Sequence, residues 1–452
     1  MTGFVRTAAD PSEAPIAPPD VLFAGLASAK GLVLAVSGGP DSTALMVLAA
    51  RWAARPPVLV ATVDHGLRSE AAAEVRIVEA NAARLGLPCR TFRIDALPGG
   101  NRQAAAREAR YGCLMRAASE VGFDTVVTAH HLEDQAETFL LRLARGSGVY
   151  GLGAMRDSRL VEGIVLARPL LDCPRAALHQ VAAASGLPVV SDPSNADLRS
   201  DRVRMRRLMP DLARHGFDAG RLAGTARRLG RAADALDWCC ERLVFERCAV
   251  SDAGEVSGPI DAILGVPEEI GDRALARMLT AVGGAAYTPD LVRVQAVRRA
   301  LAAPAPAGTA ARTLHGAVVT VADGRFRIAR EWGRAGLPVH PVHSGTAVIW
   351  DRRFRVTVPE LPGQHDVAAL GAAAAAFACD GVGRSALRTL PALYSEDRLV
   401  AVPELLRDSD HPVAARRFRA ECLVRASLYG EGAGVLQEPP SLRPSGDGTC
   451  GA

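Results

Sequence analysis

The sequence has almost no lysine. Lys30 is the only one among 53 basic residues in a chain of 452, so any basic surface must be built from arginine. A mechanism that needs a lysine side chain of this protein must use Lys30 or do without one. Acidic residues nearly balance the basic ones and leave a formal net charge of +4. This balance excludes a uniformly basic protein but allows one basic face.

Paired cysteines and long apolar runs are also lacking. The nine cysteines are scattered, and no two are spaced as CxxC. This argues against a disulfide framework or a structural zinc site and favours a reducing, cytoplasmic location. No run of about 18 apolar residues occurs, so we expect no membrane span. Residues 1–24 lack a basic region followed by an apolar core and are expected to form a flexible arm.

The length predicts more than one domain. Four apolar stretches, separated by helical patterns, are typical of short buried strands: 31–36, 57–64, 88–95 and 123–130. This alternation predicts an α/β fold with a doubly wound parallel sheet, which we assign to residues 25–205. Such sheets bind ligands at the carboxyl ends of their strands. The sequence places four polar residues there: Ser37, Asp64, Asp95 and His130.

The remaining chain changes character twice. Residues 206–300 are predicted to form a helical, arginine-rich middle domain, and residues 199–232 hold ten arginines against three aspartates. Residues 301–311 form a predicted linker. Residues 312–428 are expected to form a smaller C-terminal α+β domain, with a hairpin turn at Asp323-Gly324. Residues 429–452 are rich in Gly, Pro and Ser and are expected to be disordered.

The stretch SGGPDS, residues 37–42, stands where the first strand passes into a helix. Gly38 and Gly39 let backbone amides approach a ligand closely, and the start of a helix offers unpaired amides and a positive dipole. With the hydroxyls of Ser37 and Ser42, this predicts a cradle for phosphate oxygens. The loop lacks the lysine of a Walker A motif. A plain turn with Asp41 or Ser42 capping the helix is the alternative.

This stretch resembles the loop of the N-type ATP pyrophosphatases, which split ATP into AMP and pyrophosphate. Further segments resemble one member family, the tRNA(Ile)-lysidine synthetases, and follow in the same order: VDHGLRSE at 63–70, NRQAAAREARY at 101–111, the long segment 129–155, PLL at 169–171 and 192–210. The similarity is close over residues 30–215. It implies adenylation of the C2 oxygen of the first anticodon cytidine of tRNA(Ile) with a CAU anticodon, followed by attack of free L-lysine.

The resemblance assigns the nucleotide site to three places. Ser37, Gly38, Gly39, Pro40 and Ser42 would hold the phosphates of ATP. Asp41 would bind Mg²⁺ or orient the incoming amine, because Mg²⁺ prefers oxygen ligands. Asp64 and His65 would lie near the adenosine.

Asp134 and Glu137 are three residues apart on a predicted helix, so their carboxylates share a face. Such a pair suits binding the ammonium of lysine and accepting its proton. A solvated helix face beside Arg142 or Arg145 is the alternative. By resemblance, His130 contacts the adenylated intermediate, while His131 faces the other way.

Several arginines complete the predicted site. Arg110 matches a family arginine that reaches the phosphates or the base, with Arg107 as the competing choice. Arg202 would contact the RNA or the reacting base. The cluster would bind the tRNA backbone through Arg204, Arg206 and Arg207. The sequence departs from the family pattern at Glu133, Ser200 and Val203, which weakens a functional role for these three.

Two other functions stay open at this point. A tRNA thiolase of the same superfamily commonly needs paired cysteines, which are absent here. A nucleotide-binding or RNA-binding relative without catalysis is the other alternative, and Asp41, Asp134 and Glu137 argue against it. Residues 389–405 resemble a segment that grips the tRNA acceptor stem, although a purely structural module fits equally. The oligomeric state is open, with a homodimer as one arrangement.

Overall fold

The computed structural model describes residues 16–64, 71–94, 102–161, 163–190, 201–303, 310–334, 336–408 and 416–429. The chain divides into two compact units, Met1–Asp234 and Ala235–Ala452. The division falls inside helix α9 (Ala219–Arg247), so the segment 206–300 contributes to both units. No helix in the described ranges is long and apolar enough to cross a membrane.

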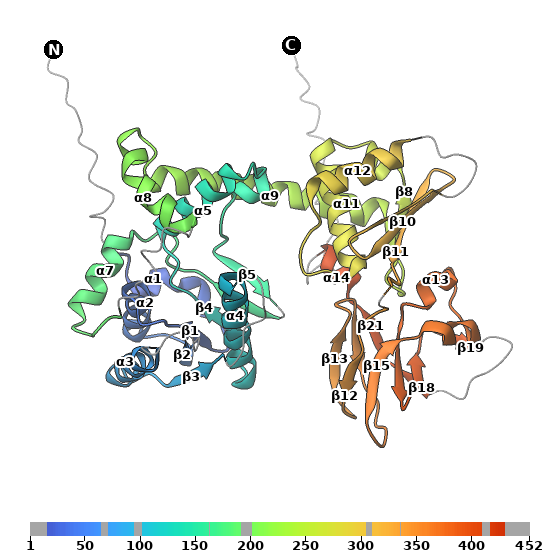
Figure 1. Ribbon diagram of the computed structural model, residues 1–452, viewed down its shortest axis with the longest axis horizontal. Coiled ribbons are helices and arrows are strands. Elements are labelled where there is room, and N and C mark those ends of the chain that lie inside the picture. Colours follow the sequence, from blue (N-terminus) through green and yellow to red (C-terminus); the bar gives the residue numbers. More distant parts are fainter. Residues whose placement is uncertain are drawn as a thin grey trace, which may run out of the picture. The chain divides into compact units, whose positions relative to one another are not determined.

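The first unit is built on a six-stranded sheet with the strand order β3-β2-β1-β4-β6-β5 (Figure 1). The strands are β1 (Leu32–Ala35), β2 (Val58–Asp64), β3 (Cys89–Arg93), β4 (Thr125–Val127), β5 (Ser158–Val161) and β6 (Ile164–Ala167). All neighbouring pairs are parallel except β5 and β6. The predicted doubly wound parallel sheet is therefore confirmed, with one antiparallel edge strand, β5, in addition. The connection between β5 and β6 is too short for a crossover and can join only antiparallel strands.

Helices cover both faces of this sheet, as predicted for a doubly wound fold. One face packs against α2 (Pro40–Arg51), α3 (Ala71–Arg84) and α7 (Arg175–Ala184), and the other against α4 (Arg102–Glu120). The strand β1 is buried on both sides, because Leu32 and Leu34 face the first layer while Val33 and Ala35 face the second. This explains why the strand is a continuous apolar run.

The end of the predicted N-terminal arm, residues 1–24, is folded in the structure. Residues 19–26 form α1 (Pro19–Leu22) and a 3-10 turn, η2 (Ala24–Leu26). Phe23 between them is only 1% exposed and stacks on Trp52 with ring centroids 5.3 Å apart. Burial of this aromatic ring fixes the segment to the domain. Residues 1–15 lie outside the described part of the chain.

Three further helices complete the first unit beside α9: α5 (Leu132–Ala144), α6 (Val149–Leu152) and α8 (Asp201–Arg214). A small apolar core joins α5 to α9 through Phe139 and Leu222. Helix α8 packs against α5. This contact brings the arginine-rich segment to the helix that carries Asp134 and Glu137.

The second unit contains two apolar cores. The first lies between a sheet of order β7-β8-β11-β10-β9 and helices α10 (Asp261–Leu264), α11 (Glu268–Gly283) and α12 (Leu291–Ala302). Its strands are β7 (Ala249–Val250), β8 (Val256–Pro259), β9 (Ala310–Leu314), β10 (Ala317–Ala322) and β11 (Arg325–Arg330). The expected all-helical segment 206–300 therefore includes two strands, because β8 pairs with β11 beyond the linker. The linker residues 304–309 lie outside the described ranges.

The second core lies among short antiparallel and mixed strands. These are β12 (His340–Val342), β13 (Ala347–Trp350), β14 (Phe354–Thr357), β15 (His365–Ala369), β16 (Phe377–Ala378), β17 (Pro391–Ser395), β18 (Arg398–Pro403), β19 (Arg407–Asp408), β20 (Arg416–Phe418) and β21 (Ala420–Cys422), with η4 (Gly371–Ala376), α13 (Arg384–Leu387) and α14 (Val424–Tyr429). The predicted hairpin at Asp323-Gly324 is confirmed, since both residues have positive φ between β10 and β11. Of residues 429–452, expected to be disordered, Tyr429 ends α14 and residues 430–452 lie outside the described part.

Candidate active site

The glycine loop after β1 has a shape that only glycine allows at one position. Gly38 has φ +84°, in the left-handed region. A Cβ atom there would lie 2.7 Å from Cγ2 of Val190. The amide of Val190 donates a hydrogen bond to the carbonyl of Gly38 at 2.9 Å, so the two segments are held in contact. The loop conformation therefore depends on Gly38.

The next residues leave an open cradle at the start of α2. Gly39 is the N-cap of this helix without a side-chain cap, and a Cβ there would meet only Ser37 Oγ, at 3.9 Å. Ser42 Oγ accepts from the Ser37 amide at 3.2 Å and donates to the Gly39 carbonyl at 3.0 Å. These bonds fold the loop around its hydroxyls. The first amides of α2 have no partner within the helix, so the loop presents hydroxyl and amide donors to an anion.

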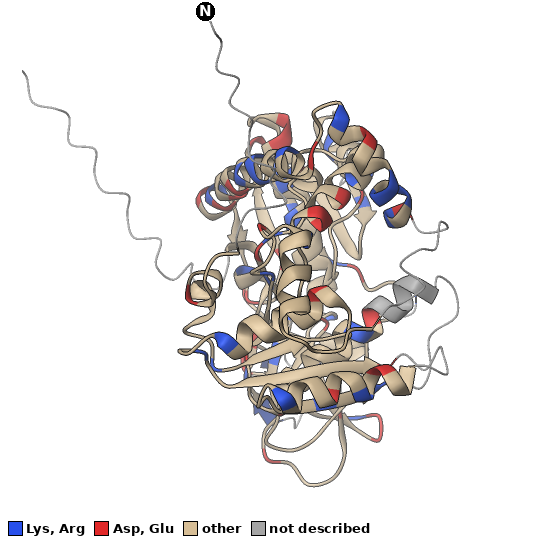
Figure 2. Ribbon diagram, turned by 90° about the vertical axis from the view of Figure 1, so that its left-hand side faces the viewer, with Lys and Arg blue, Asp and Glu red and all other residues tan. Residues whose placement is uncertain are grey.

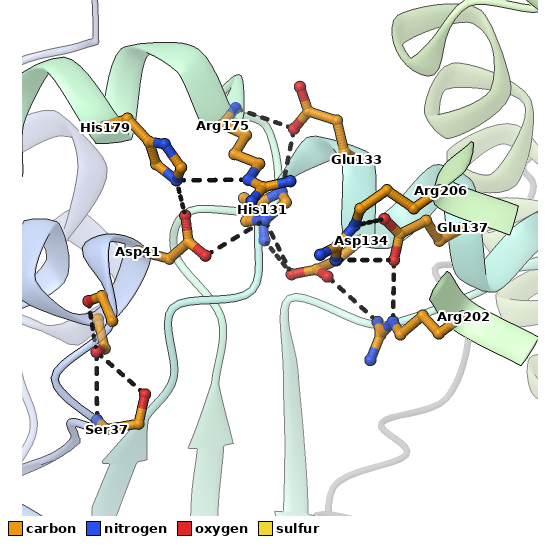
Figure 3. Close-up of polar contacts among 12 residues, drawn as sticks. Ser37, Asp41, His131, Glu133, Asp134, Glu137, Arg175, His179, Arg202 and Arg206 are labelled. Carbon is orange, nitrogen blue, oxygen red and sulfur yellow. Dashed lines mark hydrogen bonds and ion pairs between the residues drawn. The ribbon is translucent and has the colours of Figure 1, made fainter. Parts of the chain in front are cut away.

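The carboxylate of Asp41 does not cap α2. Its Oδ1 lies 2.9 Å from Nε2 of His179, and its Oδ2 lies 3.8 Å from Nε2 of His131. Figure 3 shows the carboxylate turned toward these two rings and away from Ser37. The capping alternative is therefore not observed for Asp41, which instead joins α2 to the start of α5 and to α7.

His131 lies at the centre of this cluster and is 2% exposed. Its Nδ1 is 3.0 Å from Oε2 of Glu133, and its Nε2 is 3.5 Å from Oδ2 of Asp134. The backbone amide of His131 also donates to Asp134, which closes a capping box on α5. The expectation that His131 faces away from the site is therefore wrong. Because β4 ends at Val127, His131 is no longer on the strand and is the N-cap of α5, with its ring among the carboxylates.

The charges around His131 shift three titrating groups. Burial opposes the charged imidazole, but the hydrogen bond to Glu133 and the charges of Asp134 and Asp41 outweigh it, so the pKa of His131 is raised. Burial also acts to raise the pKa of Glu133 and of Asp134, yet their interactions with His131 prevail and the pKa of each carboxyl is lowered. The cluster therefore favours a charged imidazolium between ionised carboxylates.

Glu137 is 1% exposed and is clamped by two arginines of α8. Arg202 Nε donates to Oε2 at 3.1 Å, and Arg206 Nε donates to Oε1 at 2.7 Å (Figure 3). Arg202 also lies 3.4 Å from Oδ1 of Asp134. Asp134 and Glu137 therefore share a face, as predicted. The solvated-face alternative is wrong, because α8 covers that face and Arg142 and Arg145 bond elsewhere.

The other arginines of α8 point outward. Arg204 and Arg207 are exposed, and Arg204 pairs with Asp201. Figure 2 shows basic residues recurring along the helices of the first unit, with acidic residues between them. The helix thus has an inner pair, Arg202 and Arg206, and an outer pair, Arg204 and Arg207.

The remaining predicted residues are placed as follows. Asp64 is the last residue of β2 and is half-buried, while His65 lies outside the described residues, as do Asp95 and Ser200. His130 Nδ1 is 2.8 Å from Thr128 Oγ1, just beyond β4. Arg110 is half-buried on α4, and the side chain of Arg107 is not described.

Sequence reasoning missed three residues of this cluster. Glu133 was discounted as a departure from the family pattern, yet it accepts from His131 and from the backbone amide of Arg175 at 2.9 Å. His179 and Arg175 lie on α7, one turn apart, outside the motifs used. The one signal for them in the sequence is that two basic residues follow the PLL segment with a spacing of four, which places them on one face of a helix.

Comparisons with known proteins show which chains this one is similar to. A family model described as a PP-loop domain matches residues 18–212. A tRNA(Ile)-lysidine synthase of Rhodopseudomonas palustris is 46% identical over 321 residues, covering 68% of this chain and 92% of the relative. One from Ruegeria pomeroyi is 40% identical over 379 residues, covering 82% and 88%. The match to a solved U34-tRNA thiolase from Methanococcus maripaludis covers 46% of this chain and 72% of the thiolase, at 16% identity and with a TM-score of 0.38.

Proposed function

Because the chain belongs to the tRNA(Ile)-lysidine synthase family, we propose that it attaches free L-lysine to C2 of the first anticodon cytidine of tRNA(Ile) with a CAU anticodon. The chain is an ATP-dependent ligase. The proposed course is adenylation of the C2 oxygen with release of pyrophosphate, then attack by the lysine side-chain amine with release of AMP. The observation that carries the proposal is the position of Asp41, between the glycine loop and the cluster around His131.

The loop would hold the leaving part of ATP. The amides at the start of α2 are donors set for phosphate oxygens, and the dipole of α2 adds positive potential. The Ser42 hydroxyl, which donates to the Gly39 carbonyl, would join them by turning toward the phosphate. The open space beside Gly39 supports this role, because a phosphate could approach the backbone there. Asp64 at the end of β2, with His65 after it, would contact the adenosine. His130 and Arg110 would face the nucleotide and the activated base.

The carboxylates at the start of α5 would serve the lysine step. A lysine ammonium must lose a proton before its nitrogen can attack. Oδ2 of Asp41 and Oδ2 of Asp134 both lie near Nε2 of His131, at 3.8 Å and 3.5 Å. A lysine ammonium that reaches these two oxygens would meet both carboxylates beside the ring. We propose that these two bind the amine and receive its proton.

Glu137 takes a different place in this scheme. Both of its oxygens accept from arginines of α8, so it would meet the amine only if one arginine moved away. We propose that Glu137 acts on lysine through this contact, by holding Arg202 and Arg206 beside Asp134. The outer arginines Arg204 and Arg207 would contact the tRNA backbone.

Magnesium is proposed as a companion of ATP, because Mg²⁺ commonly bridges phosphates and keeps few protein ligands. Asp41, predicted as its ligand, does not fit that role well in this arrangement. Its Oδ1 is bonded to His179, and its Oδ2, 3.8 Å from Nε2 of His131, is the oxygen proposed to meet the lysine ammonium, so a metal ion there would compete with that substrate. We therefore derive no step through a metal bound to Asp41.

The tRNA thiolase alternative finds no support in the described cysteines, all eight of which are free thiols. Sulfur transfer needs a thiolate. Cys173, which follows the PLL segment, is buried, and burial raises the pKa of its thiol to about 11. A thiol of this kind stays protonated at neutral pH.

The deciding experiment is incubation of the purified chain with ATP, magnesium, labelled lysine and a tRNA(Ile) transcript carrying CAU. Label should enter this RNA and should be absent when the anticodon cytidine is replaced by uridine. Label in both RNAs, or in neither, would contradict the proposal. A cytoplasmic location is proposed with it, since ATP, tRNA and free lysine meet there. A homodimer stays a proposal that sedimentation of the purified chain can decide.

A further inference from the structure

The carboxylate of Asp41 is held by a residue that lies outside the motifs of the sequence. His179 Nε2 and Asp41 Oδ1 are 2.9 Å apart. An ionised carboxylate can only accept a hydrogen bond, so the imidazole N–H is the donor. Asp41 opens α2 directly after the loop, while His179 is 138 residues away on α7. A residue outside the family motifs therefore contacts a carboxylate of the proposed lysine site.

The helix that carries His179 is fixed at two points. Leu178 and Ala182 are buried in the core that α7 shares with α2. At the start of α7, the Arg175 amide donates to Oε2 of Glu133, which also bonds His131. Although its own side chain is 37% exposed, His179 is thus attached to a rigid support. Because its helix is fixed, His179 can hold the side chain of Asp41 in one rotamer.

Three charged or titratable groups surround the His179 ring: Asp41 from α2, Arg175 one turn earlier on α7, and His131 across the Asp41 carboxylate. The Nε of Arg175 is 3.4 Å from the same ring nitrogen, which cannot accept from Arg175 while it donates to Asp41, so the shorter contact with Asp41 is the hydrogen bond. Because His179 takes Oδ1, the other oxygen of Asp41 is left facing His131 and the side of Asp134. The direction of Asp41 is therefore set by His179.

We propose that His179 is a positioning residue for the lysine step, acting through Asp41. Its N–H fixes the Asp41 carboxylate so that Oδ2 faces the amine of lysine, an inference that rests on the proposed function. In that step the ε-ammonium gives one proton to a carboxylate, and the free amine forms the C2–N bond. AMP leaves with the electron pair of the C2–O bond, and the nitrogen releases a second proton to water. His179 touches neither substrate.

The test compares two substitutions of His179 in the full chain. His179→Ala removes the donor and should raise KM for lysine about tenfold, as expected when one hydrogen bond to a carboxylate is removed. Formation of the adenylated tRNA without lysine, and KM for ATP, should stay within about twofold. His179→Gln keeps an N–H donor of similar reach and should restore most of the lysine KM. Gln180→Ala, exposed on the same helix, is the matched control.

Several results would overturn the inference. An unchanged lysine KM in the alanine variant, an equal rise in KM for ATP, or a glutamine variant no better than alanine would each do so. If the alanine variant does not fold, His179→Asn replaces it, because its shorter amide does not reach Asp41 and KM for lysine should rise again. Failure of the unmodified chain to form lysidine would instead refute the proposed function, since its adenylation and lysine steps are measured separately.

Discussion

The clamp on Glu137 gives the sharpest prediction about stability. Glu137→Gln removes a charge that is 1% exposed and accepts from two guanidinium groups, at 2.7 Å and 3.1 Å. Breaking a buried ion pair by removing one partner costs about 3–5 kcal/mol. Arg202 and Arg206 are each 32% exposed and can regain water, and the new amide still accepts one bond. We therefore expect a loss of about 2 kcal/mol.

This loss should be local, because the clamp joins α8 to α5. Hydrogen exchange measures the free energy of such local opening. A loss of about 2 kcal/mol should speed exchange of the α8 amides about thirtyfold. The amides of α7, whose surroundings the substitution leaves unchanged, serve as the internal reference.

The matched control is the pair Arg90–Glu120, which is 2.9 Å apart but 45% and 42% exposed. Glu120→Gln should change exchange little, because exposed pairs contribute about 0–1 kcal/mol. A double-mutant cycle with Arg206→Met should give a coupling above the about 0.5 kcal/mol seen for independent sites. Additive effects, or equal acceleration in α7 and α8, would refute the clamp.

Three further predictions concern catalysis, RNA binding and pH. Asp134→Asn should raise KM for lysine about tenfold or more while adenylation persists, since it removes a charge facing the amine; equal loss of both activities in single-turnover assays would show another role. Replacing Arg204 and Arg207 by alanine should weaken tRNA binding and reduce the slope of log affinity against log salt by about 0.7–0.9 for each phosphate that is no longer neutralised; filter binding at several salt concentrations would contradict this if the slope is unchanged. The raised pKa of His131 and the lowered pKa of Glu133 define a pH window. His131 contributes its full stabilisation below its ordinary pKa of 6.5, and this stabilisation is lost as pH rises through its raised pKa. Glu133 contributes its full stabilisation above its ordinary pKa of 4.5, and this is lost as pH falls through its lowered pKa. In Glu133→Gln, the free energy of unfolding measured by urea titration should depend less on pH at both the acidic and the basic end. A pH dependence like that of the unmodified chain would show that the His131–Glu133 pair does not stabilise the fold.

The loop and the sheet could be predicted because their signals are local. A buried strand followed by two glycines and a helix fixes where the cradle lies, and Gly38 has the left-handed φ that the glycine implied. The shared face of Asp134 and Glu137 follows from helical spacing alone. These inferences need no knowledge of what packs against the elements.

The surroundings of those residues could not be predicted in the same way. Helical spacing places Glu137 on a face but does not tell whether water or α8 covers it, and the clamp depends on arginines 65 and 69 residues later. His179 meets Asp41 only because α7 packs on α2. Burial of Phe23 likewise depends on Trp52, which the N-terminal sequence does not reveal.

Helix α8 links recognition to chemistry through its spacing. Arg202 and Arg206 are four residues apart and face inward to Asp134 and Glu137. Arg204 and Arg207, three apart, lie on the exposed side of the same helix. A tRNA phosphate bound by the outer pair would shift the position of α8. The inner pair on the same helix neutralises the carboxylates beside the proposed lysine site. The carboxylates attract an ammonium less strongly when the arginines neutralise their charge. Binding of tRNA should therefore change the affinity for lysine, and binding of lysine should change the affinity for tRNA by the same factor.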